Sequence, residues 1–198
     1  MIKEFHINID DTQIELLNKK IELTRWPDEI NNEYWSHGTS MSFLKELSEY
    51  WINNFNWRAH EQELNDIGSY KFASKTDLDI HFLHAKSNEK NALPLVMTHG
   101  WPGSVQEFIK IIPIIQEQSN RPIDIICPSL PGFGFSDKPK ELGMNSEEIA
   151  KIQHELMMAM GYKKYVVQGG DWGAAVSKWM AELFPESCSG IHLDLVIA

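Results

Sequence analysis

Apolar residues recur every three or four positions along much of the first third of the chain. This spacing predicts amphipathic helices, because residues three and four apart share one helix face. The predicted helices span residues 11–24, 41–54 and 58–65. Two shorter apolar runs follow, and the polar pair Thr76-Asp77 between them predicts the turn of a β-hairpin. The strands of this hairpin are predicted at residues 70–73 and 78–85.

The pattern changes after a polar break at Lys86 to Leu93. From there, short continuous apolar runs alternate with helical segments, which indicates a parallel sheet covered on both faces. Strands are predicted at 94–98, 123–127, 165–168 and 190–196, and helices at 105–118, 146–160 and 174–183. The sequence therefore predicts the α/β class, with a largely helical N-terminal region at residues 1–90 and a sheet-forming region at residues 91–198.

Composition narrows the possible partners. Acidic residues outnumber basic ones, 28 to 18, and no basic cluster is present, so nucleic acid and anionic membranes are poor partners. We expect a cytoplasmic protein without a membrane span, because the N-terminus lacks an apolar signal region and every apolar stretch is short. Neither the two cysteines, Cys127 and Cys188, nor His81 and His84 on opposite strand faces match a metal site. We expect no metal or cofactor, and a small-molecule substrate.

The string GGDWG, Gly169 to Gly173, follows an apolar run and precedes a helical segment. Strand, sharp turn and helix form the setting of a nucleophile elbow, where small residues let strand and helix approach closely. Asp171 takes the nucleophile position, with Gly169, Gly170 and Gly173 as its small neighbours. A carboxylate is ionised at neutral pH, and its attack on saturated carbon gives an alkyl ester that water can cleave. This favours strained ethers and alkyl halides as substrates, although the string taken alone could be a plain turn.

A second string, HGWPGS, comes directly after a predicted strand, so it should meet GGDWG at the carboxyl edge of the sheet. Such a bend can aim backbone N–H groups at the nucleophile and form an oxyanion hole. We assign the hole to the N–H groups of Trp101 and Trp172, with His99, Gly100 and Pro102 shaping the loop. The alternative is an ordinary connection between a strand and a helix.

With these motifs, the chain resembles the microsomal-type and juvenile-hormone-type epoxide hydrolases of the α/β-hydrolase superfamily. The matching strings are RWPDE (25–29), YWSHG (34–38), YWINNFNWR (50–58), IHFLH (80–84), THGWPGS (98–104), PSLPGFGFSDKP (128–139) and QGGDWG (168–173). The resemblance implies an N-terminal meander, residues 1–90, followed by the first part of an α/β-hydrolase core, residues 91–198. It also implies conversion of an epoxide and water into a vicinal diol, through an ester on Asp171.

In that family, cap tyrosines supply the acid, and a histidine backed by a carboxylate activates water; all these residues follow the last strand predicted here. The resemblance therefore implies that the cap and the C-terminal part of the core are absent. Asp194, at the end of the last strand, is a candidate for the supporting carboxylate, although such a residue is more often an ordinary polar group at a strand end.

Two alternatives stay open. A haloalkane dehalogenase would use the same ester; this chain keeps Trp172 but has Trp101 where dehalogenases often have Asn, and its N-terminal region favours the epoxide enzyme. The other alternative is a fragment or remnant without turnover. The apolar segment 191–198 would then leave an unpaired sheet edge, so we expect the expressed chain to be poorly soluble.

Overall fold

The computed structural model describes residues 1–30 and 35–196. By its internal contacts the chain divides into two compact units. The sheet unit contains residues 1–6 and the chain from Glu63 onward, and the helical unit contains Ile7–Gln62. Among the described residues, no helix is long and apolar enough to cross a membrane.

The helical unit contains the three helices that the apolar spacing predicts. They are α1 (Asp11–Glu22), α2 (Met41–Asn53) and α3 (Trp57–Ile67), the last of which continues past the division between the units. Local polar side chains explain where the first two begin. The Asp10 carboxylate accepts a hydrogen bond from the Thr12 N–H, and the Ser40 hydroxyl accepts one from the Phe43 N–H. These N-caps satisfy N–H groups that a helix leaves free in its first turn.

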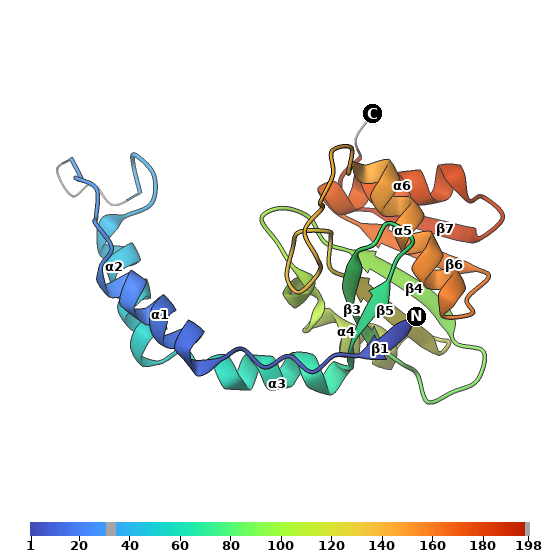
Figure 1. Cartoon of the computed structure of the whole chain (residues 1–198), viewed down its shortest axis with the longest axis horizontal. Coiled ribbons are helices and arrows are strands. Elements are labelled where there is room, and N and C mark those ends of the chain that lie inside the picture. Colours follow the sequence, from blue (N-terminus) through green and yellow to red (C-terminus); the bar gives the residue numbers. More distant parts are fainter. Residues whose placement is uncertain (31–34, 197–198) are drawn as a thin grey trace. The chain divides into compact units, whose positions relative to one another are not determined.

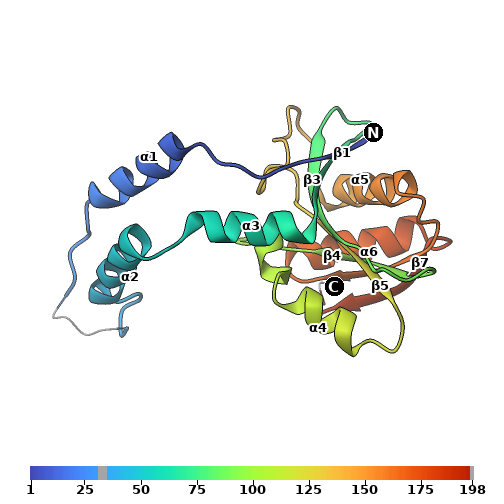
Figure 2. The same cartoon turned by 90° about the horizontal axis from the view of Figure 1, so that it is seen from below.

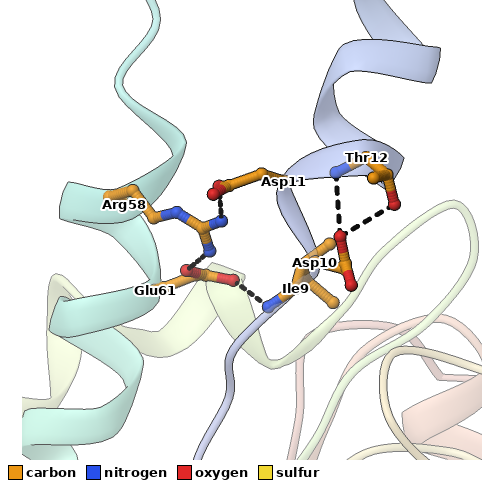
Figure 3. Close-up of polar contacts among 6 residues, drawn as sticks. All are labelled: Ile9, Asp10, Asp11, Thr12, Arg58 and Glu61. Atoms are coloured by element: carbon orange, nitrogen blue, oxygen red, sulfur yellow. Dashed lines mark hydrogen bonds and ion pairs between the residues drawn. The ribbon is translucent and has the colours of Figure 1, made fainter.

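Charged side chains connect the segment that enters α1 to helix α3 (Figure 3). The Arg58 guanidinium forms ion pairs with Asp11 and with Glu61, the latter at 2.5 Å. The second carboxylate oxygen of Glu61 accepts a hydrogen bond from the Ile9 N–H at 2.6 Å. The side chain of Glu61 is buried, whereas those of Arg58 and Asp11 are exposed. A single buried carboxylate thus joins two segments that are about fifty residues apart.

In the sheet unit, the described strands form one seven-stranded sheet in the order β1-β2-β3-β5-β4-β6-β7. Strands β1, β2, β3 and β5 pair antiparallel, and β5, β4, β6 and β7 pair parallel. The strands are β1 (Ile2–Glu4), β2 (Ser69–Ala73), β3 (Asp79–Ala85), β4 (Leu93–Thr98), β5 (Ile123–Pro128), β6 (Tyr165–Gly169) and β7 (Cys188–Leu193). The predicted hairpin is β2 and β3, which joins the same sheet as the parallel strands.

Helices cover both faces of this sheet (Figures 1 and 2). Helices α5 (Ser146–Ala159) and α6 (Trp172–Leu183) pack together on one face, and α4 (Ile111–Gln118) lies on the other. Between the sheet and the pair α5 and α6 lies the main apolar core. Its members from the strands and helices include Phe82, Val96, Ile126, Leu156, Val167, Val176 and Met180. The core therefore fixes the strand ends that carry the motifs.

Two predicted elements have clearly different bounds in the structure. The predicted helix 105–118 is a short 3₁₀ helix, η1 (Val105–Phe108), followed by α4. Pro113 explains the break, since it has no N–H and its ring clashes with the carbonyl four residues earlier in a continuous helix. The last strand ends at Leu193 rather than at residue 196, because its partner β6 ends at Gly169, which pairs with Leu193. The short strand β1 was not predicted.

Candidate active site

Asp171 lies on the turn between β6 and α6, where the sequence predicts a nucleophile elbow. It precedes the first residue of α6 and has φ of 50° and ψ of −125°, a conformation that non-glycine residues rarely adopt. The turn also brings strands and helix very close together. A Cβ atom built on Gly173 would lie 1.9 Å from the Thr98 carbonyl oxygen, so only glycine fits there. The glycines are thus required by the approach of the helix to β4 and β6.

The loop after β4 contacts Asp171 through its backbone. The Trp101 N–H donates a hydrogen bond to Asp171 Oδ1 at 2.7 Å. Hydrogen bonds from the N–H groups of Trp101 and Trp172 lower the pKa of Asp171, outweighing the slight opposite effect of burial. The Trp101–Pro102 peptide bond is cis. The carboxylate is therefore ionised at neutral pH, and the Trp101 N–H donates to it.

An open pocket of about 340 Å³ surrounds this carboxylate. Its lining residues come from the ends of β4 and β6, from the chain directly after β4, β6 and β7, and from η1. They are Thr98, His99, Gly100, Trp101, Pro102, Glu107, Phe108, Gln168, Gly170, Asp171 and Asp194. The predicted convergence of HGWPGS and GGDWG at the carboxyl edge of the sheet is therefore confirmed.

His99 lies within this pocket wall but is almost fully buried, at 1% exposure. Its Nε2 accepts a hydrogen bond from the Leu130 N–H at 3.1 Å, and its Nδ1 lies 3.0 Å from the Gly100 carbonyl oxygen. Burial lowers the pKa of His99, against smaller raising effects of Gly100 and Glu107. Because both nitrogens have partners, His99 is not available as a base toward a molecule in the pocket.

Asp194 directly follows β7 and also lines the pocket. Its carboxylate lies against Gly170: a Cβ atom built on that glycine would be 2.3 Å from Asp194 Oδ1. Gly170 thus makes room for a second carboxylate beside the turn that carries Asp171. The sequence placed Asp194 within the last strand, whereas the structure places it just beyond the strand end.

A buried polar network behind the site was missed in the sequence. His81 in β3 bonds through Nδ1 to the Ser129 hydroxyl at 2.8 Å and through Nε2 to the Ser69 hydroxyl at 3.0 Å. The Ser129 N–H donates to the His81 carbonyl at 2.8 Å, and Ser129 precedes Leu130, the partner of His99. These partners are hydroxyls and backbone groups from distant segments, for which the sequence carries no signal.

The described residues contain no group of three or more histidine, cysteine, aspartate or glutamate side chains placed to hold a metal ion. Cys127 is fully buried in β5, which raises the pKa of its thiol. It lies in the core of the sheet, away from the pocket lining.

Comparison with known families agrees with the fold and with the position of these motifs. Residues 2–108 match the family model described as "Epoxide hydrolase N terminus", and residues 94–196 match the model of the α/β hydrolase fold. The chain belongs to the epoxide hydrolase family. The family-model matches confirm the resemblance drawn from the sequence, and the mixed sheet between helices confirms the predicted α/β-hydrolase fold class.

Individual relatives agree with this assignment. The chain is 35% identical to epoxide hydrolase 1 of Sus scrofa over 206 residues, covering 99% of this chain and 45% of that protein. It is 38% identical to juvenile hormone epoxide hydrolase 1 of Ctenocephalides felis, covering 98% of this chain and 43% of that protein. The crystal structure of juvenile hormone epoxide hydrolase from Bombyx mori superimposes with a TM-score of 0.90 at 34% identity, covering 98% of this chain and 53% of that one. The chain thus spans about half the length of these relatives.

Proposed function

We propose that this chain provides the nucleophile and the oxyanion hole of an epoxide hydrolase, which converts an epoxide and water into a vicinal diol. The observation that carries the proposal is the hydrogen bond from the Trp101 N–H to Asp171 Oδ1. It holds one carboxylate oxygen and leaves the other, Oδ2, to act as the nucleophile at the pocket. In this proposal the turn at Gly169 to Gly173 is a nucleophile elbow.

In the first step, Asp171 Oδ2 attacks an oxirane carbon. A bond forms between Oδ2 and that carbon, the carbon–oxygen bond of the ring breaks, and the ring oxygen takes up a proton from an acid or from water as it leaves. The product is a glycol ester of Asp171 with a free hydroxyl on the neighbouring carbon. The low pKa of Asp171 supports this step, because the nucleophile is ionised without a base.

In the second step, water attacks the ester carbonyl carbon of Asp171 and loses a proton. The carbonyl oxygen becomes an oxyanion at the Oδ1 position, where the N–H groups of Trp101 and Trp172 stabilise it. Collapse of the intermediate releases the diol and restores the carboxylate. Neutral His99 has both nitrogens engaged, so the base for this step is another residue.

Two further expectations from the sequence become part of the proposal. Asp194 lies close enough to the turn to support a water-activating base, because its carboxylate contacts Gly170. A role in epoxide catabolism or detoxification is in keeping with the reaction. A cytoplasmic location and the absence of nucleic-acid partners stay predictions from the sequence.

The proposal is tested by treating the 198-residue chain with an aryl epoxide, styrene oxide, and measuring the mass of the intact protein. We expect one adduct per chain, located on Asp171 by peptide mapping, and no adduct on the Asp171→Asn variant at the same exposure. Release of diol over many turnovers would contradict the prediction that these residues form the ester without hydrolysing it.

A parallel reaction with 1-chlorobutane separates the two candidate chemistries. The epoxide proposal predicts much slower ester formation from the chloroalkane than from the epoxide. Faster chloride release with ester formation on Asp171, and little reaction with styrene oxide, would support the dehalogenase alternative. An absence of adducts from both reagents would contradict an Asp171 nucleophile in this chain.

A further inference from the structure

The backbone N–H that donates to Asp171 Oδ1 and the carbonyl oxygen that bonds to His99 Nδ1 belong to one peptide group. The Gly100 carbonyl and the Trp101 N–H lie on the two sides of the same planar bond. In a trans peptide these two groups point in opposite directions, so fixing one also fixes the other. The hydrogen bond of His99 to Gly100 therefore controls where the Trp101 N–H points.

The imidazole of His99 is held in one tautomer. Its Nε2 accepts the Leu130 N–H, so that nitrogen carries no proton. The proton of the neutral ring is then on Nδ1, which donates it to the Gly100 carbonyl oxygen at 3.0 Å. The ring of Phe133 packs edge-on against the imidazole of His99, with 5.5 Å between the ring centroids. His99 thus offers a donor in one direction and an acceptor in the other.

The Leu130 donor is itself fixed in place. The preceding residue, Ser129, bonds to His81 through both its N–H and its hydroxyl, each at 2.8 Å. The carbonyl oxygen of Ser129 accepts a hydrogen bond from the Ser136 hydroxyl at 2.8 Å. Strand β3 therefore anchors the loop against which the imidazole of His99 is oriented.

The Gly100–Trp101 peptide needs such a restraint. A Cβ atom at residue 100 would lie 2.5 Å from Asp171 Oδ1, so the close approach requires glycine. Glycine also gives the backbone access to conformations that other residues avoid, including rotation of the adjacent peptide plane. The residue that allows the contact is thus also the one that could let the donor turn away.

We propose that His99 is a positioning residue, whose Nδ1–H holds the Gly100 carbonyl so that the Trp101 N–H stays directed at Asp171 Oδ1. This proposal rests on the proposed function only for the catalytic role of the Trp101 N–H. The hydrogen-bond geometry itself can be tested without turnover.

Three substitutions separate the two bonds of the ring. His99→Phe removes both. His99→Asn places an amide donor near the position of Nδ1, within reach of Gly100, but cannot extend to Leu130. His99→Gln places an amide oxygen near the position of Nε2, where it can accept from Leu130. His154→Phe is the control at a histidine outside the site, since His154 is a partly buried histidine in α5 whose Nδ1 bonds to the Tyr165 hydroxyl.

The readout is the backbone amide signal of Trp101 in chain labelled with ¹⁵N-tryptophan, at neutral pH. The chain has seven tryptophans, and loss of a signal in Trp101→Phe assigns the one of interest. A hydrogen bond to a carboxylate shifts this proton downfield and slows its exchange with solvent. Asp171→Ala supplies the reference signal for a Trp101 amide without its acceptor.

We expect the Trp101 signal to move toward the Asp171→Ala position in His99→Phe and in His99→Gln, and to stay in place in His99→Asn and His154→Phe. Rescue by Gln rather than Asn would overturn the proposal and show that the bond to Leu130 is the one that matters. An unmoved signal in His99→Phe would also overturn it. If His99→Phe does not fold, the Asn and Gln pair gives the same decision. Failure of wild-type chain to form an ester with styrene oxide would count against the proposed function alone.

Discussion

The sheet unit and the helical unit are stabilised in different ways. Helices α5 and α6 each bury five residues against the sheet. Helix α1, which lies wholly within the described residues, buries none of its side chains, and the described residues of α2 bury only Met41. The helical unit also contains ring contacts, such as Phe55 stacked on His60 with 4.7 Å between centroids, and the bonds of Arg58 and Glu61 to the start of α1 (Figure 3). Apolar burial is extensive in the sheet unit, whereas α1 and α2 bury little and a polar network joins the start of α1 to α3.

This difference determines which kind of change each unit tolerates. Close packing makes the sheet unit sensitive to added volume, because neighbouring backbone atoms cannot move apart cheaply. The polar network makes the helical unit sensitive to loss of a charge or of a hydrogen-bond partner. The predictions below test this contrast in order of expected effect.

The largest effect is expected from a single methyl group at the turn. In Gly173→Ala the new Cβ would meet the Thr98 carbonyl oxygen at 1.9 Å, and that oxygen belongs to the backbone and cannot move aside as a flexible side chain could. We expect a loss of at least about 3 kcal/mol in the free energy of unfolding, measured by urea denaturation. Gly190→Ala is the matched control, since its Cβ would have its nearest neighbour at 3.7 Å, and it should change stability by less than about 0.5 kcal/mol. Equal effects of the two substitutions would contradict a packing origin.

The second prediction concerns the effect of low pH on the free energy of unfolding. Burial, with a smaller effect of Lys71, lowers the pKa of His81 from 6.5 to about 4. Between these values the unfolded chain binds the proton and the folded chain does not, so stability falls as the pH is lowered from about 6.5 to about 4. The loss should approach about 3 kcal/mol in urea titrations across this range. His84 and His99 contribute in the same direction, since burial also lowers their pKa values. A His81→Gln chain should show a shallower pH dependence; an unchanged slope would exclude His81 as its source.

The third prediction concerns the helical unit and is smaller. In Glu61→Gln the Ile9 N–H keeps an acceptor, but the ion pair with Arg58 is lost. We expect a local loss of about 1–2 kcal/mol, because the Arg58 side chain is 41% exposed and solvent screens the pair. Hydrogen exchange of the amides of Ile9 and α1 in the full chain measures it. Asp77→Asn, which removes an ion pair whose side chains are 63% and 93% exposed, is the control and should cost less than about 0.5 kcal/mol.

The two units should also differ in the pH at which they lose stability. Burial tends to raise the pKa of Glu61, but hydrogen bonds from Ile9 and Arg58 outweigh it and lower the pKa below its usual 4.5. The contribution of Glu61 is thus present above about pH 4.5 and is lost as the pH falls through the lower folded value. Protection of α1 should therefore persist to lower pH than the stability that depends on His81. Simultaneous loss would contradict separate origins.

Sequence predicted the fold well where apolar pattern and local chemistry agree. The parallel strands, the hairpin and the three N-terminal helices were all visible from spacing and turn residues. The exceptions have local causes. Pro113, in the first turn of α4, prevents the predicted helix from being continuous, and β1 is three residues long and depends on pairing with β2. Such a short strand carries too little pattern to be seen without its partner.

The site was predictable to the extent that its residues lie in contiguous motifs. The meeting of Trp101 with Asp171 followed from two strings placed after neighbouring strands. The supporting bonds did not, because His81 and His99 reach partners such as Ser129 and Leu130 through hydroxyl and backbone groups. A backbone donor that lies outside a recognised motif is not marked by any residue type, so only the folded chain reveals it. The same holds for the link from Glu61 to Ile9.

Trp101 and Trp172 are 66% and 56% exposed, and it is their backbone N–H groups that lower the pKa of Asp171. The donor therefore belongs to the main chain, and every amino acid except proline would supply it. At these two positions the side chain can therefore change while the N–H donor is kept. Over evolution, substitutions at these positions can alter which molecules the pocket binds without removing the two N–H donors.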